Sequence, residues 1–269
     1  MNIWQADFYK RSQSEASGEI LWELLACDRA GNLCCIASCP QKQANSDWLA
    51  SQLKNAAGDI LPDEIQVFRP QSLSLLTAAG EKLGIPVTAT RRTEALKRIL
   101  QERWGQNAIA LDRLPPQALP DTLWGEQWRF ASLPAGEIVE VFRDRPIPIL
   151  ELPESLHPLS LGIAAPTPIP GIIIDGGRRS MQLARWLQEV NPAAVNYIPT
   201  TIGESGGLIL EAGLVERWVL ITFEDEEVAR SAEAYNQRKQ GSKGLHFLLV
   251  RPDDSGVTYS GLWLLRSED

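Results

Sequence analysis

Basic side chains are concentrated around two predicted helices, and they are the residues of this sequence best suited to binding phosphate groups. The guanidinium of arginine is a planar fork that can hold phosphate oxygens with two parallel hydrogen bonds. One group surrounds the helix predicted over residues 93–104, a second lies at the start of the helix predicted over 178–190, and one arginine ends the strand predicted over 64–69. The candidate RNA-binding residues are Arg69, Arg91, Arg92, Lys97, Arg98, Arg103, Arg178 and Arg179.

Aromatic side chains offer a second kind of contact. The chain contains nine tryptophans and four tyrosines, and aromatic rings stack on the unpaired bases of single-stranded RNA. Tyr9 and Trp104 are the candidates for stacking. The alternative is an ordinary solvated helix surface, on which Glu94 and Glu102 partly balance the arginines, because charge runs on helices are usually surface features.

Carboxylates offer a different chemistry, metal-dependent cleavage of nucleic acid. In a ribonuclease H-like domain, acids on the first strand, on the first helix and at the end of the fourth strand hold two divalent ions. Here Asp7 falls on the first predicted strand and Glu23 on the second, but the fourth ends in Phe68-Arg69-Pro70. A cationic Arg69 at that position would repel the ions. The sequence therefore predicts no catalytic residue, and a nuclease using Asp7, Glu23 and a third acid is the alternative.

Other polar motifs do not predict a cofactor or a metal site. The segment DGG at 175–177 lacks the complete pattern of a dinucleotide or phosphate-binding loop, and the segment GESGG at 203–207 is expected to form a flexible loop. His246 is expected to be a hydrogen-bonded structural residue in a closing hairpin over 244–265. The cysteines are expected to be reduced and packed as small apolar side chains; they are Cys27, Cys34, Cys35 and Cys39.

The order of predicted elements gives the fold class. Residues 1–105 read as βββαβαβα, the element order of ribonuclease H-like domains, and 171–269 as a second α/β domain with a mixed sheet. Eleven of the eighteen prolines lie between residues 115 and 170. Since proline suits neither a helix interior nor a central strand, residues 106–170 are predicted to be a connector, with a possible edge strand at 147–153.

Charge and hydropathy limit the classes of function. The formal net charge is −8 and the isoelectric point about 5.0, so RNA binding would depend on a local basic patch rather than on the charge of the whole chain. No apolar run reaches the length of a transmembrane helix, and the first residues do not resemble a secretory signal. A cytoplasmic location is expected.

The chain resembles the TAB/ATAB family of cyanobacteria, algae and plants along almost its full length. The segments that carry the resemblance occur in the family's order: WQADFYKR, GEILWELLACD, NSDWLASQL, VFRPQSLSLLTAAGEKLGI, TRRTEAL, LPDTLWGEQWRF, IPGIIID, LILEAGLVERW, GLHFLLV and GLWLL. The compact length without a transit peptide is typical of a cyanobacterial member.

The resemblance implies a noncatalytic RNA-binding role. Chloroplast members bind the messenger RNA of a photosystem I reaction-centre subunit, at its 5′ untranslated region, and promote its translation. By resemblance, this chain would bind single-stranded mRNA and act with translation or photosystem assembly proteins. A protein-binding adapter for photosystem assembly is a further alternative. The resemblance assigns no RNA-contacting residue, so the candidates remain those of the basic clusters.

Overall fold

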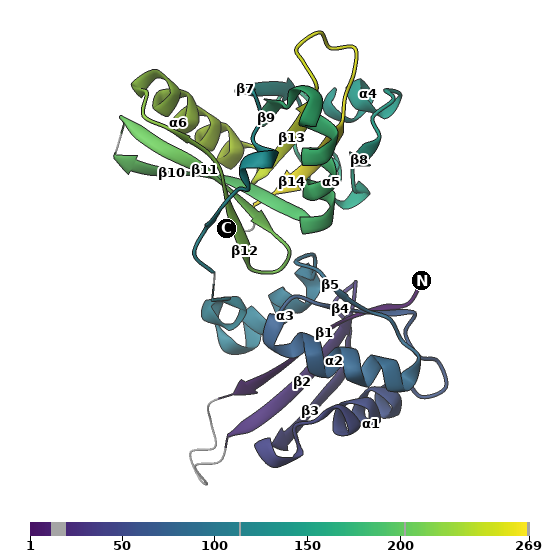
Figure 1. Cartoon of the computed structure of the whole chain (residues 1–269). Coiled ribbons are helices and arrows are strands. Elements are labelled where there is room, and N and C mark those ends of the chain that lie inside the picture. The colour runs from purple at the N-terminus through teal and green to yellow at the C-terminus, as the bar shows by residue number, and fades with distance from the viewer. Residues whose placement is uncertain (12–19, 113, 202, 268–269) are drawn as a thin grey trace. The chain divides into compact units, whose positions relative to one another are not determined.

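The structure, a computed structural model, describes residues 1–11, 20–112, 114–201 and 203–267. The chain divides into two compact units, Met1–Asp112 (unit 1) and Arg113–Asp269 (unit 2). Both contain helices and mixed sheets (Figure 1), which confirms the predicted fold class of two α/β domains.

Unit 1 is built on one five-stranded sheet. Its elements are β1 (Ile3–Arg11), β2 (Leu21–Asp28), β3 (Leu33–Pro40), η1 (Gln41–Gln43), α1 (Ser46–Ala57), β4 (Glu64–Val67), α2 (Pro70–Leu83), β5 (Val87–Ala89), α3 (Glu94–Trp104) and η2 (Gln106–Ile109). The strands lie in the order β3-β2-β1-β4-β5; β1 pairs antiparallel with β2 and parallel with β4. The observed βββαβαβα order is the predicted one.

The two faces of this sheet carry different side chains because consecutive residues of a strand point to opposite sides. Trp4, Ala6 and Phe8 of β1 belong to a core that includes residues of α1 and α2. On the other face, α3 packs through a smaller core that includes Leu96 and Leu100. The polar residues of β1 alternate with its apolar ones, so they lie on the α3 side.

Unit 2 contains two sheets. Its elements are β6 (Gln117–Ala118), η3 (Asp121–Leu123), β7 (Gln127–Pro134), α4 (Ile138–Arg143), β8 (Ile149–Glu151), η4 (Glu154–Leu156), β9 (Pro168–Asp175), η5 (Gly177–Arg179), α5 (Ser180–Val190), β10 (Pro192–Thr201), β11 (Ser205–Ala212), β12 (Glu216–Phe223), α6 (Glu226–Gly241), β13 (Leu245–Arg251) and β14 (Gly261–Arg266). One sheet has the order β10-β11-β12-β6, and the other has the order β7-β9-β13-β14-β8.

The proline-rich residues differ from the predicted connector. The division of the chain falls after Asp112, and the stretch that follows supplies β7 and β8, the two edge strands of the second sheet. The edge strand expected at 147–153 is present as β8. Edge strands tolerate proline because one side of their backbone needs no ladder hydrogen bond. Most of 106–170 is therefore part of unit 2 rather than a separate connector.

The closing hairpin is also present, with β13 antiparallel to β14. His246 is fully buried in β13, its Nε2 accepts a hydrogen bond from the backbone N–H of Val195 (2.8 Å), and its Nδ1–H donates to the carbonyl of Gly244 (2.8 Å). Burial, followed by the charge of Lys239, lowers the pKa of His246 to about 3. A neutral histidine thus joins β13 to β10 of the other sheet, and its predicted structural role is confirmed.

Candidate nucleic-acid interface

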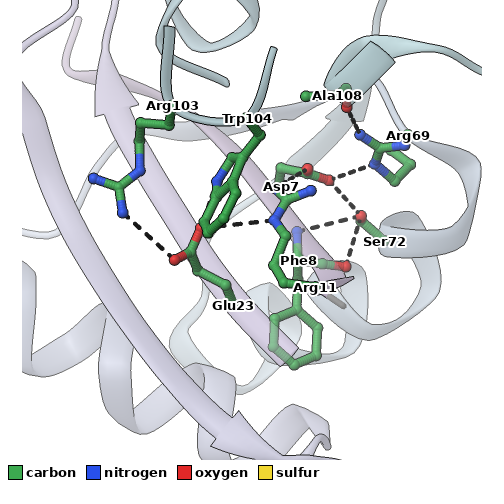
Figure 2. Close-up of polar contacts among 9 residues, drawn as sticks. All are labelled: Asp7, Phe8, Arg11, Glu23, Arg69, Ser72, Arg103, Trp104 and Ala108. Carbon is green, nitrogen blue, oxygen red and sulfur yellow. Dashed lines mark hydrogen bonds and ion pairs between the residues drawn. The ribbon is translucent and has the colours of Figure 1, made fainter. Parts of the chain in front are cut away.

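The polar face of β1 holds a buried carboxylate surrounded by donors. Asp7 lies two residues before Tyr9 and four before Arg11, so all three side chains lie on the α3 side of the sheet. Asp7 Oδ1 accepts hydrogen bonds from Arg69 Nε (2.9 Å) and Ser72 Oγ (2.8 Å), and its Oδ2 lies 3.4 Å from Arg11 Nη2. Figure 2 shows these three donors converging on Asp7.

Arg69 is buried, whereas a phosphate contact requires an arginine at the surface. Its side chain is only 3% exposed, its Nη2 donates to the carbonyl of Ala108 (2.6 Å), and its guanidinium lies 4.2 Å from the centre of the Tyr9 ring. The residue follows β4, which runs parallel to β1, and this topology brings its side chain to Asp7. We therefore leave Arg69 out of the proposed RNA contacts.

A second carboxylate connects this buried cluster to the surface. Glu23 of β2 lies directly opposite Tyr9 in the strand register. Its carboxylate accepts a hydrogen bond from Trp104 Nε1 (3.2 Å) and lies 3.6 Å from Arg103 Nη2 and 3.7 Å from Arg11 Nε. The ring of Trp104 is 43% exposed. We call Tyr9, Arg11, Arg103 and Trp104 the Arg–Trp surface; Figure 2 labels all of them except Tyr9.

The remaining basic residues of unit 1 lie around α3. Arg92 and Arg98 are exposed and Arg91 is half-buried, whereas Lys97 is buried and donates through Nζ to the carbonyl of Arg91 (2.6 Å). Gln5 of β1 accepts from the backbone N–H of Leu96 (3.0 Å), which fixes the first turn of α3 against the sheet. Lys97 thus has an internal role, and Arg91, Arg92, Arg98 and Arg103 remain the candidates of unit 1.

Arg178 and Arg179 belong to unit 2, in the short helix η5 that follows β9. Both are exposed, and Arg179 Nη1 donates to the carbonyl of Asp121 in η3 (3.4 Å). The structure therefore brings Arg179 to η3, with Arg178 as its exposed neighbour, while the other candidates lie in unit 1.

The carboxylates that could have held metal ions are occupied by cations of the chain. Asp7 accepts from Arg69 and Ser72, and Glu23 lies beside Arg11 and Arg103. Within the described ranges, no three His, Cys, Asp or Glu side chains are grouped so as to hold a metal ion. The geometry of this cluster suits anchoring of cationic and aromatic side chains rather than two-metal cleavage.

The four cysteines are free thiols on β2 and β3. Cys27, Cys35 and Cys39 are buried and Cys34 is half-buried; burial raises the pKa of the Cys27 thiol to about 12. These thiols pack as small apolar groups, as expected. None of the helices in the described part of the chain is long and apolar enough to cross a bilayer.

Two family models match consecutive parts of the chain. The model for "RNA-binding protein Tab2/Atab2 N terminal" matches residues 3–103, and the model for "RNA-binding protein Tab2/Atab2, C-terminal domain" matches residues 106–266. The chain belongs to the Tab2/Atab2 family. The resemblance in the sequence segments is thereby confirmed.

Individual relatives of the Tab2/Atab2 family agree with this assignment. The chain is 29% identical over 280 residues to "Protein TAB2 homolog, chloroplastic" of Arabidopsis thaliana, covering 97% of this chain and 74% of the relative. It is 30% identical over 283 residues to the protein of the same name from Zea mays, covering 97% and 70%. The catalytic core domain of HTLV-2 integrase matches 41% of this chain and 75% of its own, with 14% identity and a TM-score of 0.25, and supports no argument here.

One residue of the Arg–Trp surface was missed in the sequence. Arg11 was not among the candidate contacts, although it bridges Asp7 and Glu23 in the structure. The signal was present as the alternation Asp7, Tyr9, Arg11 within a strand whose intervening residues are Phe8 and Lys10. Reading β1 with a period of two would have placed all three on one face.

Proposed function

We propose that this member of the Tab2/Atab2 family is a noncatalytic RNA-binding factor that promotes translation or assembly of photosystem reaction-centre proteins. Its ligand would be the 5′ untranslated region of a single-stranded mRNA. The protein would act in the cytoplasm. The observation that supports RNA contact most directly is the Arg–Trp surface. There, an exposed tryptophan and an exposed arginine are held in place by one buried carboxylate, Glu23.

The Arg–Trp surface suits a single strand because it combines stacking with phosphate contact. Trp104 is fixed through its Nε1, so its ring is already oriented and binding would cost little additional side-chain entropy. The guanidiniums of Arg11 and Arg103 lie 5.5 Å and 5.8 Å from the Trp104 ring. An unpaired base can stack on such a ring while arginine contacts the neighbouring phosphate.

The charges of the cluster also favour an anionic ligand. Arg11, Arg69 and Arg103 surround two carboxylates, those of Asp7 and Glu23, which leaves one positive charge in excess. Arg92, just before α3, and Arg98, within it, add exposed charge. Since the whole chain is acidic, RNA binding depends on local basic patches, and this local excess would favour binding at the cluster.

The nuclease alternative is not supported by the same cluster. Two-metal cleavage requires carboxylate oxygens that are free to coordinate divalent ions. Both oxygens of Asp7 already face donors of the chain, because Arg69 and Ser72 contact Oδ1 and Arg11 lies beside Oδ2. We therefore propose a binding role for this surface and no catalytic one.

The test is charge reversal at the start of α3. The double variant Arg91→Glu, Arg92→Glu should lower affinity for fluorescently labelled single-stranded RNA by at least about tenfold, because phosphate contacts dominate such binding. Thermal unfolding should be unchanged. The matched control is Lys42→Glu, Lys54→Glu, which alters the net charge equally at exposed positions in η1 and α1. Equal affinity of both double variants and the wild type would reject phosphate contacts at Arg91 and Arg92.

The role in photosystem biogenesis needs a cellular test. Crosslinking of the native protein in cells, followed by sequencing of the recovered RNA, should enrich messages for photosystem reaction-centre subunits at their 5′ untranslated regions. Recovery of unrelated RNA would contradict the photosystem assignment while leaving RNA binding intact. Recovery of no RNA, together with no affinity in solution, would instead favour the protein-binding adapter.

A further inference from the structure

Unit 2 contains a small aromatic cavity that belongs to no part of the Arg–Trp surface. Its volume is about 210 Å³, and its walls include Trp124, Trp128, Ile174 and Leu183. The volume is below the roughly 300–1,000 Å³ of pockets that take drug-sized ligands. The cavity therefore suits a single ring system rather than a whole nucleotide.

The two tryptophans are held in fixed positions. Trp124 is 58% exposed, and its Nε1 donates to the carbonyl of Leu119 (3.0 Å). Gly125 then packs so closely on β9 that a Cβ there would lie 2.4 Å from Ile174, and the backbone N–H of Glu126 donates to the carbonyl of Asp175 (2.8 Å). The Trp124 indole and the backbone that follows it are thus held in place, while the residue is more than half exposed.

Trp128 is fixed by other aromatic rings. Its ring packs edge-on against Phe130, with centroids 5.3 Å apart, and at a tilt against Phe223, at 5.8 Å. A cavity whose aromatic walls are oriented before a ligand arrives costs little entropy to fill.

One wall of the cavity is a strand edge. Among the described residues, β6 pairs with β12 only at Trp218 and Val219. The next three residues of β12, Leu220 to Thr222, line the cavity beyond the end of this pairing. An edge strand presents backbone N–H and C=O groups, so the cavity combines apolar ring faces with a row of donors and acceptors. A nucleobase has the same two features, an apolar face and a hydrogen-bonding edge.

Exposed cations lie beside the cavity. Arg179 donates to the carbonyl of Asp121 in η3, and η3 leads directly into Trp124. Arg178 is its exposed neighbour. The phosphates on either side of an inserted base would be close to these two guanidiniums. The carboxylate of Glu126 lies against Gly177 and is an acid at the same rim, so Glu126→Gln should strengthen binding rather than weaken it.

We infer that this cavity, called here the Trp124 pocket, binds one unpaired nucleobase of the RNA, with Trp124 stacking on the base and Arg178 and Arg179 contacting its phosphates. This inference rests on the proposed RNA-binding function and adds a second contact point in unit 2. The occupant is a base rather than an aliphatic side chain because the cavity joins stacking rings, a polar strand edge and adjacent cations.

The test uses the full chain and single-stranded oligouridylate or oligoadenylate of about 12 nucleotides, within the site sizes typical of single-strand binders. Trp124→Ala should weaken binding by about 5- to 150-fold, the usual effect of removing one stacking ring. Trp124→Phe loses the same bond to Leu119 but keeps a ring, so it should retain most of the affinity. Val257→Ala, an exposed apolar control in the same unit, should bind as the wild type does. The indole N–H signals of Trp124 and Trp128 should shift when RNA is added.

The outcomes separate this inference from the proposed function. If the wild type binds RNA and Arg91→Glu, Arg92→Glu weakens binding, but Trp124→Ala binds normally and the indole signals of Trp124 and Trp128 do not move, the Trp124 pocket is rejected and the proposed function stands. If the wild type binds no RNA, both are rejected. If the indole signals respond to an extended apolar peptide and not to RNA, the strand edge serves a protein partner and the base assignment is wrong.

Discussion

Each unit contains a buried aspartate paired with arginines, and the two clusters differ in what lies beyond the pair. In unit 1, Asp7 is paired with Arg69 and Arg11, and the cluster continues through Glu23 to an exposed arginine and an exposed tryptophan. In unit 2, Asp175 is paired with Arg251 (2.6 Å) and Arg129 (3.2 Å).

The surroundings of Asp175 are acidic. Asp253 and Asp254 are exposed in the turn that follows β13. Burial raises the pKa of Asp175, Arg129 lowers it, and the charges of Asp254 and Asp253 raise it further. Two arginines therefore face three acids in unit 2, whereas three arginines face two acids in unit 1.

The comparison shows that a buried arginine–aspartate pair does not by itself indicate a nucleic-acid site. Such pairs fix strands: Asp175 joins β9 to β7 and β13, and Asp7 joins β1 to Arg69, the residue directly before α2. What distinguishes unit 1 is the excess of positive charge and its extension to an exposed aromatic ring. On this basis the Asp175 cluster is structural, and the Asp7 cluster is both structural and the support of a binding surface.

The largest expected effect is on stability. Asp7→Asn would leave Arg69 buried without its carboxylate, and loss of one partner of a buried ion pair costs about 3–5 kcal/mol of unfolding free energy. Asp175→Asn should cost less, about 2 kcal/mol, because Arg129 is partly solvated and the repulsion from Asp253 and Asp254 is relieved. Urea unfolding followed by NMR of the buried indoles of Trp4 for unit 1 and Trp263 for unit 2 separates the two losses. A larger loss in unit 2 would contradict the comparison.

The next-largest expected effect is a difference between the two units in how their free energy of unfolding depends on pH. His246 has a folded pKa of about 3 and an unfolded value near 6.5. Its contribution to stability is therefore complete above pH 6.5 and is lost as the pH falls towards 3. Unit 2 should lose about 2 kcal/mol between pH 7 and pH 5. Both histidines of the chain lie in unit 2, so unit 1 should not show this loss.

The variant His246→Gln isolates that contribution. Glutamine has no proton to gain in this range and keeps an acceptor for the backbone N–H of Val195. The raised pKa of Asp175 acts in the opposite direction, since a group protonated more easily when folded gains stability as the pH falls. The same unfolding experiment should show a flatter pH dependence for the indole of Trp263 in the variant. An unchanged slope would mean that His246 is not the group responsible.

Local patterns predicted the elements of the fold well. The alternation of β1, the helical spacing around α3 and the turns between β13 and β14 are all encoded within a few residues. The proline-rich stretch was misjudged because proline reports only that a residue cannot occupy a helix interior or a central strand. Whether it lies in a connector or in an edge strand depends on pairing with β9 and β14, which are distant in sequence.

The candidate site was predicted less completely for the same reason. Arg92, Arg98 and Arg103 were recognised because cationic residues cluster around one helix. Arg69 is buried because of Asp7, 62 positions away, and no local signal indicates such a partner. The Trp124 pocket is assembled from four separated parts of the chain, so its existence could not be read from the spacing of its tryptophans.

The smallest expected effect is on the salt dependence of RNA affinity, and it tests the comparison between the two clusters most directly. Arg103 and Arg129 are matched: their side chains are 38% and 43% exposed, and each is paired with a buried carboxylate, at 3.6 Å and 3.2 Å. Each phosphate contact to a single strand contributes about 0.7 to the slope of log affinity against log salt concentration. Arg103→Gln should therefore reduce the slope by about 0.7, and Arg129→Gln should leave it unchanged.

Both substitutions remove one charge from the same acidic chain, so a nonspecific effect of net charge would appear equally in the two variants. An equal reduction of the slope would mean that the excess of positive charge around Asp7 and Glu23 has no special role. A reduction for Arg103 alone would show that the arginine beside the exposed tryptophan contacts phosphate, while its counterpart beside Asp175 only holds strands together.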